Sequence, residues 1–190
     1  MIKADLSPIE EVYLEFIEHV DNGMKNEHGR QLKYLVTGGW AVDGICGKVT
    51  RYHENVDLMV PKDNMDKFVS ALYAYNEDAE VSHSGKNIHA EAGSIRADVI
   101  IMYPIGEEYA FDTPYHNDGA PVWKHLVRGQ RVKLNGVGFV SLNAGALYYA
   151  KLCAIRRTSK EKNRDERDLR RLAPFVPPKD REQMRAYARI

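Results

Sequence analysis

Hydrophobic residues near the N-terminus recur at steps of three and four, the spacing of one face of an α-helix. The helix is expected to begin at Ser7, because Ser7, Pro8 and Glu10 form a capping box with proline at the first helical position. The apolar positions that follow are Ile9, Val12, Tyr13, Phe16, Ile17, Val20 and Met24. They predict an amphipathic helix of about five turns with one apolar face.

The segment at residues 34–60 alternates short apolar runs with glycines and polar residues. Its expected elements are a strand at 35–37, a short helix at 40–45, a polar loop at 48–54 and a second strand at 56–60. The turn Gly38-Gly39 ends the first strand, Gly47 is placed to cap the helix, and Pro61 ends the second strand. This segment contains most of the candidate chemistry of the chain.

Later residues continue the alternation of helical and extended patterns. We expect a helix capped by Asp63 or Asn64, a hairpin with strands at 79–83 and 87–92, an apolar strand at 95–103, and a second hairpin with strands at 131–134 and 138–140. Residues 104–123 lack periodicity and predict a long loop, and such loops in compact domains are often functional. Ser141 is the expected cap of a further helix, and Pro177-Pro178 precedes a last short one.

The two parts of the chain differ in pattern. The N-terminal two-thirds mixes helices and strands, whereas the C-terminal third is mainly helical. We therefore predict an α/β core at residues 1–140 and a helical part at residues 141–190. The helical part has too few apolar positions to fold alone, so it is expected to pack on the core.

Composition narrows the class of protein. The 190 residues are 44% hydrophobic and 28% charged, as in a soluble globular domain. The 27 basic and 27 acidic residues balance, which argues against non-specific nucleic-acid binding. No run approaches membrane-spanning length and the N-terminal MIKADLSPIEE lacks a signal-peptide core, so we predict a cytoplasmic protein without membrane contact. Cys46 and Cys153 could pair, but two buried thiols in a reducing compartment are expected.

Polar residues within the predicted strands are the candidates for chemistry. Asn55 and Asp57 are two positions apart, so they share one face of a strand while Glu54 faces the other side. Asp98 lies in the apolar sequence SIRADVIIMY, where a buried carboxylate needs a partner or a metal ion. If the two strands are neighbours, Asp98 lies beside Asp57, close to the Gly38-Gly39 turn. Oxygen ligands beside a turn that can approach phosphate suit metal-assisted nucleotidyl transfer.

These motifs resemble those of the antibiotic nucleotidyltransferases, the lincosamide and aminoglycoside adenylyltransferases of the DNA polymerase β-like superfamily. The family patterns are G-G-W-x-x-D, then R-x-H-x-D-h-D, then an aspartate on a later strand. The corresponding residues are Gly38-Gly39-Trp40-Ala41-Val42-Asp43, Arg51, His53, Asn55-Val56-Asp57 and Asp98. The family's helical tail has a lysine and then K/R-D-x-x-D-L, and it is similar to Lys151 and Arg164-Asp165-Glu166-Arg167-Asp168-Leu169.

The resemblance implies an α+β fold, with a mixed sheet flanked by helices and a small helical C-terminal part. It also implies that Asp57 and Asp98 bind Mg²⁺ and act in catalysis, with Asn55 at a third ligand position and Asp98 accepting the proton of the acceptor hydroxyl. The residues implied near the triphosphate are Gly38, Gly39, Arg51, His53 and Lys151. The family transfers a nucleoside monophosphate, usually AMP from ATP, to a hydroxyl of a small acceptor such as an aminoglycoside or a lincosamide, and releases pyrophosphate. Some relatives build the site between two subunits, so a homodimer stays open.

Asn55 departs from the family pattern, which has aspartate there. An amide oxygen still coordinates Mg²⁺, but the site loses one negative charge, which should weaken the metal site and the charge neutralisation that phosphoryl transfer needs. Glu54 cannot replace the lost charge, because it faces the other side of the strand. Three explanations stay open: a natural protein with reduced or lost activity, a substitution introduced to trap substrates, or an active protein with a different metal arrangement.

Simpler interpretations of single residues stay open as well. Asp98 could form a salt bridge with Arg96 or Arg51, His53 and Arg51 could lie on the surface, and Lys151 could face water. The acidic residues of the long loop could receive a cationic aminoglycoside; they are Glu107, Glu108, Asp112 and Asp118.

Two other classes of function compete with a small-molecule transferase. One is a module that binds a nucleotide without turnover, or a toxin-type nucleotidyltransferase that acts on RNA or protein. The other is an interaction domain that binds no nucleotide. Binding and turnover of MgATP, with and without Asn55, would separate these classes.

Overall fold

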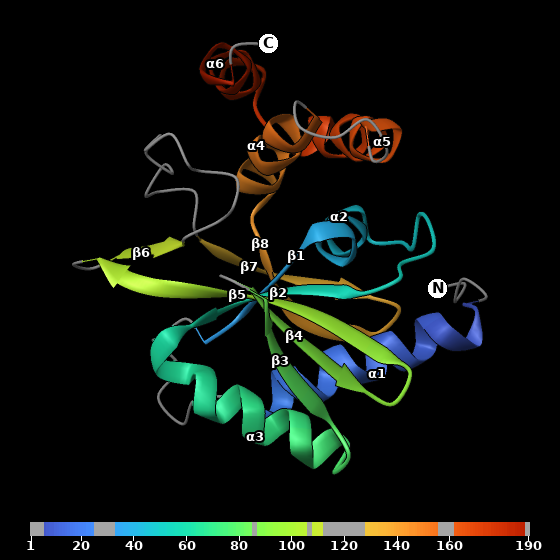
Figure 1. Ribbon diagram of the computed structural model, residues 1–190. Coiled ribbons are helices and arrows are strands. Elements are labelled where there is room, and N and C mark those ends of the chain that lie inside the picture. The colour runs from blue at the N-terminus through green and yellow to red at the C-terminus, as the bar shows by residue number, and fades with distance from the viewer. Residues whose placement is uncertain are drawn as a thin grey trace.

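The computed structural model describes residues 6–24, 33–84, 87–105, 108–111, 128–155 and 162–188. A β-sheet runs through the middle of the molecule, and helices cover both of its faces (Figure 1). None of the described helices combines the length and the apolar character that crossing a bilayer requires.

Among the described residues, the sheet has eight strands: β1 (Leu35–Thr37), β2 (Val56–Pro61), β3 (Glu80–Ser84), β4 (Asn87–Ala92), β5 (Ile95–Ile105), β6 (Glu108–Phe111), β7 (Gly129–Leu134) and β8 (Val137–Leu142). They follow the order β3-β4-β5-β2-β1-β8-β7, and β6 pairs with β5. The pairs β1–β8 and β2–β5 are parallel and the other pairs are antiparallel. The sheet is therefore mixed, and the predicted α+β class is confirmed.

Two helical layers enclose the sheet (Figure 1). One layer holds α1 (Pro8–Gly23) and α3 (Met65–Tyr75), and the other holds α2 (Gly38–Cys46), α4 (Ala144–Ile155), α5 (Lys162–Leu172) and α6 (Pro178–Tyr187). Short 3-10 helices span Lys62–Asn64 and Ala173–Phe175. α2 contacts strands β1, β2, β7 and β8 on one side and helices α4 and α5 on the other. The C-terminal helices thus pack on the core in large part through α2.

Several local predictions are confirmed. The backbone N–H of Ser7 donates a 2.8 Å hydrogen bond to the Glu10 carboxylate, as a capping box requires. Gly47 ends α2 in the left-handed conformation, with φ of 71°. Asn135 and Gly136 both have positive φ, the conformation of the tight turn that joins β7 to β8.

Other local predictions need correction. Ser141 does not cap α4, because β8 runs on to Leu142 and includes Ser141. The cap is Asn143, whose side-chain oxygen accepts a 3.0 Å hydrogen bond from the backbone N–H of Ala146. The long loop expected at residues 104–123 contains strand β6, which pairs with the far end of β5. Pro61 belongs to β2 as its last residue.

Candidate active site

Asp57 and Asp98 lie side by side in the sheet. Strands β2 and β5 pair in parallel with Asp57 opposite Asp98, as expected for neighbouring strands. The side-chain amide of Asn55 joins the two carboxylates: its Nδ2 donates to Asp98 Oδ2 at 2.5 Å and to Asp57 Oδ1 at 3.4 Å. Glu54 is exposed. The predicted cluster of three side chains therefore forms, with Asn55 acting as a hydrogen-bond donor.

Asp98 has surroundings different from those expected. Its side chain is 39% exposed rather than buried. The salt bridges considered for it are not formed: Arg96 pairs with Glu91 at 3.5 Å, and Arg51 pairs with Asp168 at 3.6 Å. Asp98 is thus accessible to a molecule that arrives from solvent.

The closeness of the two carboxylates affects the protonation of Asp57. Burial, and after it the negative charge of Asp98, raises the pKa of Asp57 above its usual value. The positive charges of Lys151, Arg164 and Arg51 act in the opposite direction on that pKa. Two adjacent carboxylates that repel each other are suited to a divalent cation, which removes the repulsion.

The residues present fit Mg²⁺ together with a nucleotide rather than Mg²⁺ alone. Within the described ranges, no three Asp, Glu, His or Cys side chains converge into a metal-binding group. Mg²⁺ does not need such a cage, since it is commonly held by one or two carboxylates plus substrate phosphates and water. Asp57 and Asp98 supply two carboxylates, and an NTP would supply the phosphates.

The two glycines of the turn make room for side chains of the site. Gly38 begins α2 with φ of 63°, and a Cβ atom there would overlap the Asp57 carboxylate. A Cβ atom on Gly39 would overlap the His53 ring and the Arg51 guanidinium. The turn therefore needs glycine for its packing, independently of any phosphate. It also places the N-terminus of α2 beside Asp57.

His53 is buried, so the interpretation of it as a surface residue is wrong. Its Nε2 lies 2.6 Å from Asp43 Oδ2, and its ring packs against Trp40 with centroids 4.6 Å apart. Asp43 is fully buried and also accepts hydrogen bonds from the backbone and hydroxyl of Thr50. This position favours a supporting role for His53, in which it fixes the loop against α2, over the phosphate contact that the resemblance implied.

Lys151 does not face water. Its side chain is 12% exposed, and its ammonium group lies 2.6 Å from Asp165 and 3.2 Å from Asp168. Asp168 also pairs with Arg171 at 3.2 Å and with Arg51. The guanidinium of Arg171 donates to the carbonyl oxygen of Thr50, so this network ties α4 and α5 to the loop before β2.

Asp165 and Asp168 hold Lys151 in place, a contact that the sequence motifs did not predict. The K/R-D-x-x-D-L segment could have indicated that the two aspartates act together, since residues three positions apart lie on one face of a helix. His89 is another missed residue. Its Nδ1 lies 2.5 Å from Asp98 Oδ1, and the register of the predicted hairpin with the next strand could have indicated it.

Some predicted features lie outside the described residues. These are the side chains of Glu107, Glu108, Asp112 and Asp118, and the charged residues 156–161.

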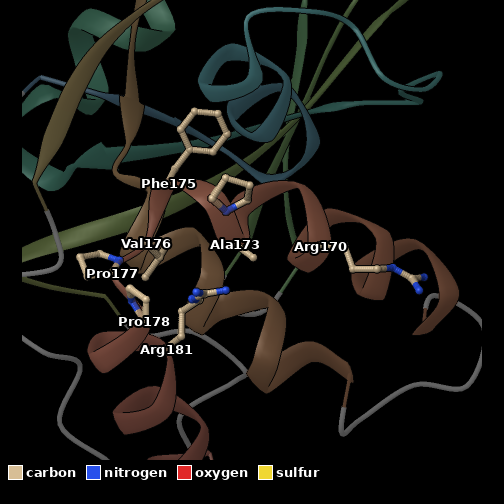
Figure 2. A pocket seen from close by; sticks show the side chains of 8 residues that line it. Arg170, Ala173, Phe175, Val176, Pro177, Pro178 and Arg181 are labelled. Carbon is tan, nitrogen blue, oxygen red and sulfur yellow. The ribbon is translucent and has the colours of Figure 1, made fainter.

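A separate surface hollow of about 480 Å³ is lined by residues of α5, α6 and the segment between them (Figure 2). The Arg170 side chain points away from the other labelled side chains, so the two arginines of this hollow, Arg170 and Arg181, do not converge on a common ligand. None of the predicted site residues lines it.

Comparison with known proteins matches this chain to a family model and to solved structures. The model of the family described as Aminoglycoside-2''-adenylyltransferase matches residues 24–171. No curated protein sequence matches the chain. The crystal structure of ANT(2'')-Ia in complex with adenylyl-2''-tobramycin is similar in fold, with a TM-score of 0.71 and 18% identity over 94% of this chain and 97% of that one.

Two further solved structures have the same fold. The lincomycin-bound lincosamide antibiotic adenylyltransferase LnuA has a TM-score of 0.59 and 16% identity, covering 91% of this chain and 100% of that one. An antigenic nucleotidyltransferase-like protein from Paracoccidioides brasiliensis has a TM-score of 0.58 and 16% identity, covering 97% of this chain and 89% of that one. The fold is therefore that of a nucleotidyltransferase.

Proposed function

We propose, from the premise that this chain belongs to the aminoglycoside-2''-adenylyltransferase family, that it transfers AMP from ATP to a hydroxyl group of an aminoglycoside or a similar small acceptor. The observation that carries the proposal is the in-register pair Asp57 and Asp98 beside the N-terminus of α2. Unpaired N–H groups at a helix N-terminus favour phosphate. The positive charges of Lys151 and Arg51 lie close enough to Asp57 to lower its pKa, and so they also lie near the space proposed for the phosphates.

In the proposed reaction, the acceptor oxygen forms a bond to the α-phosphorus of ATP. The bond from that phosphorus to the bridging oxygen of the β-phosphate breaks, and pyrophosphate leaves. The hydroxyl proton passes to the Asp98 carboxylate, which is exposed enough to meet the acceptor. Asp57 and Asp98 would hold Mg²⁺, which would supply positive charge against the phosphates. Arg51 and Lys151 would add positive charge near the phosphates.

Asn55 is proposed to slow this reaction without preventing nucleotide binding. Two carboxylates stay available for Mg²⁺, but the site has one negative charge fewer than the family pattern provides. A second candidate function is nucleotide binding without turnover. The 2.5 Å hydrogen bond from Asn55 to Asp98 Oδ2 favours this candidate, because it engages an oxygen that would otherwise be available to a metal ion and to the acceptor hydroxyl.

Pyrophosphate release with MgATP and a panel of aminoglycosides and lincomycin tests the first candidate. The wild-type chain is expected to turn over, and Asn55→Asp should raise kcat by roughly tenfold, equivalent to about 1.4 kcal/mol of transition-state stabilisation. Asp57→Ala should abolish MgATP binding in calorimetry. Glu54→Gln is the matched control, since the side chain next to Asn55 is exposed and should be without effect.

The outcomes separate the candidates. MgATP binding without pyrophosphate release by the wild-type chain, together with release by Asn55→Asp, would establish the second candidate. Undiminished MgATP binding by Asp57→Ala would refute the metal site and both candidates that depend on it.

A further inference from the structure

His89 contacts the carboxylate that is proposed to accept the proton. Strand β4 runs antiparallel to β5, with His89 directly opposite Asp98. The His89 Nδ1 and the Asp98 Oδ1 are 2.5 Å apart. A carboxylate can only accept a hydrogen bond, so this contact requires the proton on Nδ1 of the ring.

The two oxygens of Asp98 have different partners. Oδ1 is held by His89 from β4, and Oδ2 by Asn55 at the start of β2, on the side of Asp57. The terminal torsion of an aspartate side chain has only a broad preference, so the orientation of the carboxylate depends on its hydrogen-bond partners. Asp98 is partly exposed and is repelled by Asp57, and both conditions favour rotation toward solvent.

We propose that His89 is a positioning residue for Asp98. Its Nδ1–H holds Oδ1 and thereby keeps Oδ2 directed at the space between Asn55 and Asp57, where the metal ion and the acceptor hydroxyl would be. His89 acts in this role only as a hydrogen-bond donor, and the reaction proton goes no further than Asp98 before it passes to water. The inference rests on the proposed transfer reaction and assigns to it a residue outside the family motifs.

A pair of substitutions separates hydrogen bonding from proton transfer. His89→Asn places a side-chain amide N–H on Cγ, where the imidazole has Nδ1, and so keeps the donor. His89→Leu has no donor. Loss of a donor that orients a metal-binding carboxylate typically costs about 10- to 100-fold, so His89→Leu should lower kcat by that factor while the KM for ATP changes by less than about twofold. His89→Asn should stay within about threefold of the wild-type kcat.

The control is His83→Leu, which removes an exposed histidine of the adjacent strand β3 that does not face Asp98. Thermal unfolding of each variant checks that the fold is kept. An undiminished kcat in His89→Leu would overturn the proposal. A loss in His89→Asn as large as that in His89→Leu would also overturn it, because it would show that the ring itself must take up a proton.

A measurement on the metal-free protein tests the contact without turnover. Nitrogen-15 NMR of the histidine rings, with His89 assigned from the His89→Asn spectrum, should show the Nδ1–H tautomer for His89. In Asp98→Asn this preference should be lost. An Nε2–H tautomer in the wild-type chain would overturn the proposal. Absence of pyrophosphate release from both the wild-type chain and Asn55→Asp would refute the proposed function, and with it the catalytic purpose of His89, even where the tautomer is as expected.

Discussion

Replacement of Asn55 by aspartate would put a third carboxylate against Asp57 and Asp98. In the structure the Asn55 amide donates to Asp98 at 2.5 Å and to Asp57 at 3.4 Å. An ionised aspartate can donate to neither, so two attractive contacts become two repulsive ones. The metal-free protein should lose stability, and a divalent cation should restore it.

The size of the loss follows from two contributions. A hydrogen bond to a charged acceptor contributes about 1.5–3 kcal/mol to stability. Two unit charges about 4 Å apart repel by about 4 kcal/mol at an effective dielectric constant of about 20. Asn55 is only half-buried and Asp98 is partly exposed, so screening by water reduces this to roughly 1–2 kcal/mol per pair. Uptake of a proton by the cluster offsets part of the sum, which leaves about 2–4 kcal/mol.

Thermal unfolding in EDTA and in Mg²⁺ provides the assay. For a chain of this length, 1 kcal/mol corresponds to about 2–4 °C, so Asn55→Asp should lower Tm by roughly 5–15 °C in EDTA. The rise in Tm on addition of Mg²⁺ should be larger for Asn55→Asp than for the wild-type chain. Asn55→Ala is the matched control, since it removes the amide and adds no charge. A Tm in EDTA equal to that of the wild type, or an equal loss in Asn55→Ala, would refute the electrostatic reasoning.

Three other predictions concern stability. Asp168→Asn should destabilise the protein by about 3–5 kcal/mol in urea unfolding, because it removes a buried carboxylate from its partly buried cations. Glu91→Gln, in an exposed pair, should cost less than about 1 kcal/mol. Gly39→Ala should cost about 1–3 kcal/mol, because His53 is locked in place behind it; unchanged unfolding would show that the turn can relax. The raised pKa of Asp57 means that the folded state binds its proton more tightly than the unfolded state. In EDTA the unfolding free energy should therefore fall as pH rises from about 4 through the raised pKa, and Asp57→Asn should remove that part of the pH dependence.

The C-terminal helices contribute charged side chains next to the candidate active site. Lys151 of α4 and Asp168 of α5 meet Arg51 from the loop before β2. A single buried carboxylate thus sets the positions of cations from three separate segments. Disturbance of α5 is expected to reach the proposed nucleotide site through Arg51 and Lys151.

Features that depend on near neighbours in the chain were determined by the sequence itself. The capping box at Ser7 and the left-handed cap at Gly47 each follow from the chemistry of one or a few adjacent residues. The shared face of Asn55 and Asp57 follows from the two-residue period of a strand. The pairing of Asp57 with Asp98 was expected only on the condition that their strands are neighbours, and the parallel register of β2 and β5 places the two residues opposite each other.

Only the tertiary structure decided which side chains meet Asp98, His53 and Lys151. The contact of His89 with Asp98 depends on strand register, and a slip of one residue would turn the His89 side chain to the opposite face. The burial of His53 against Asp43 and the capture of Lys151 by Asp165 and Asp168 depend on how α2, α4 and α5 pack. Sequence spacing places a residue on one face of its own element. Packing against other elements determines what that face meets, and therefore whether a charged residue faces solvent, a substrate or a buried partner.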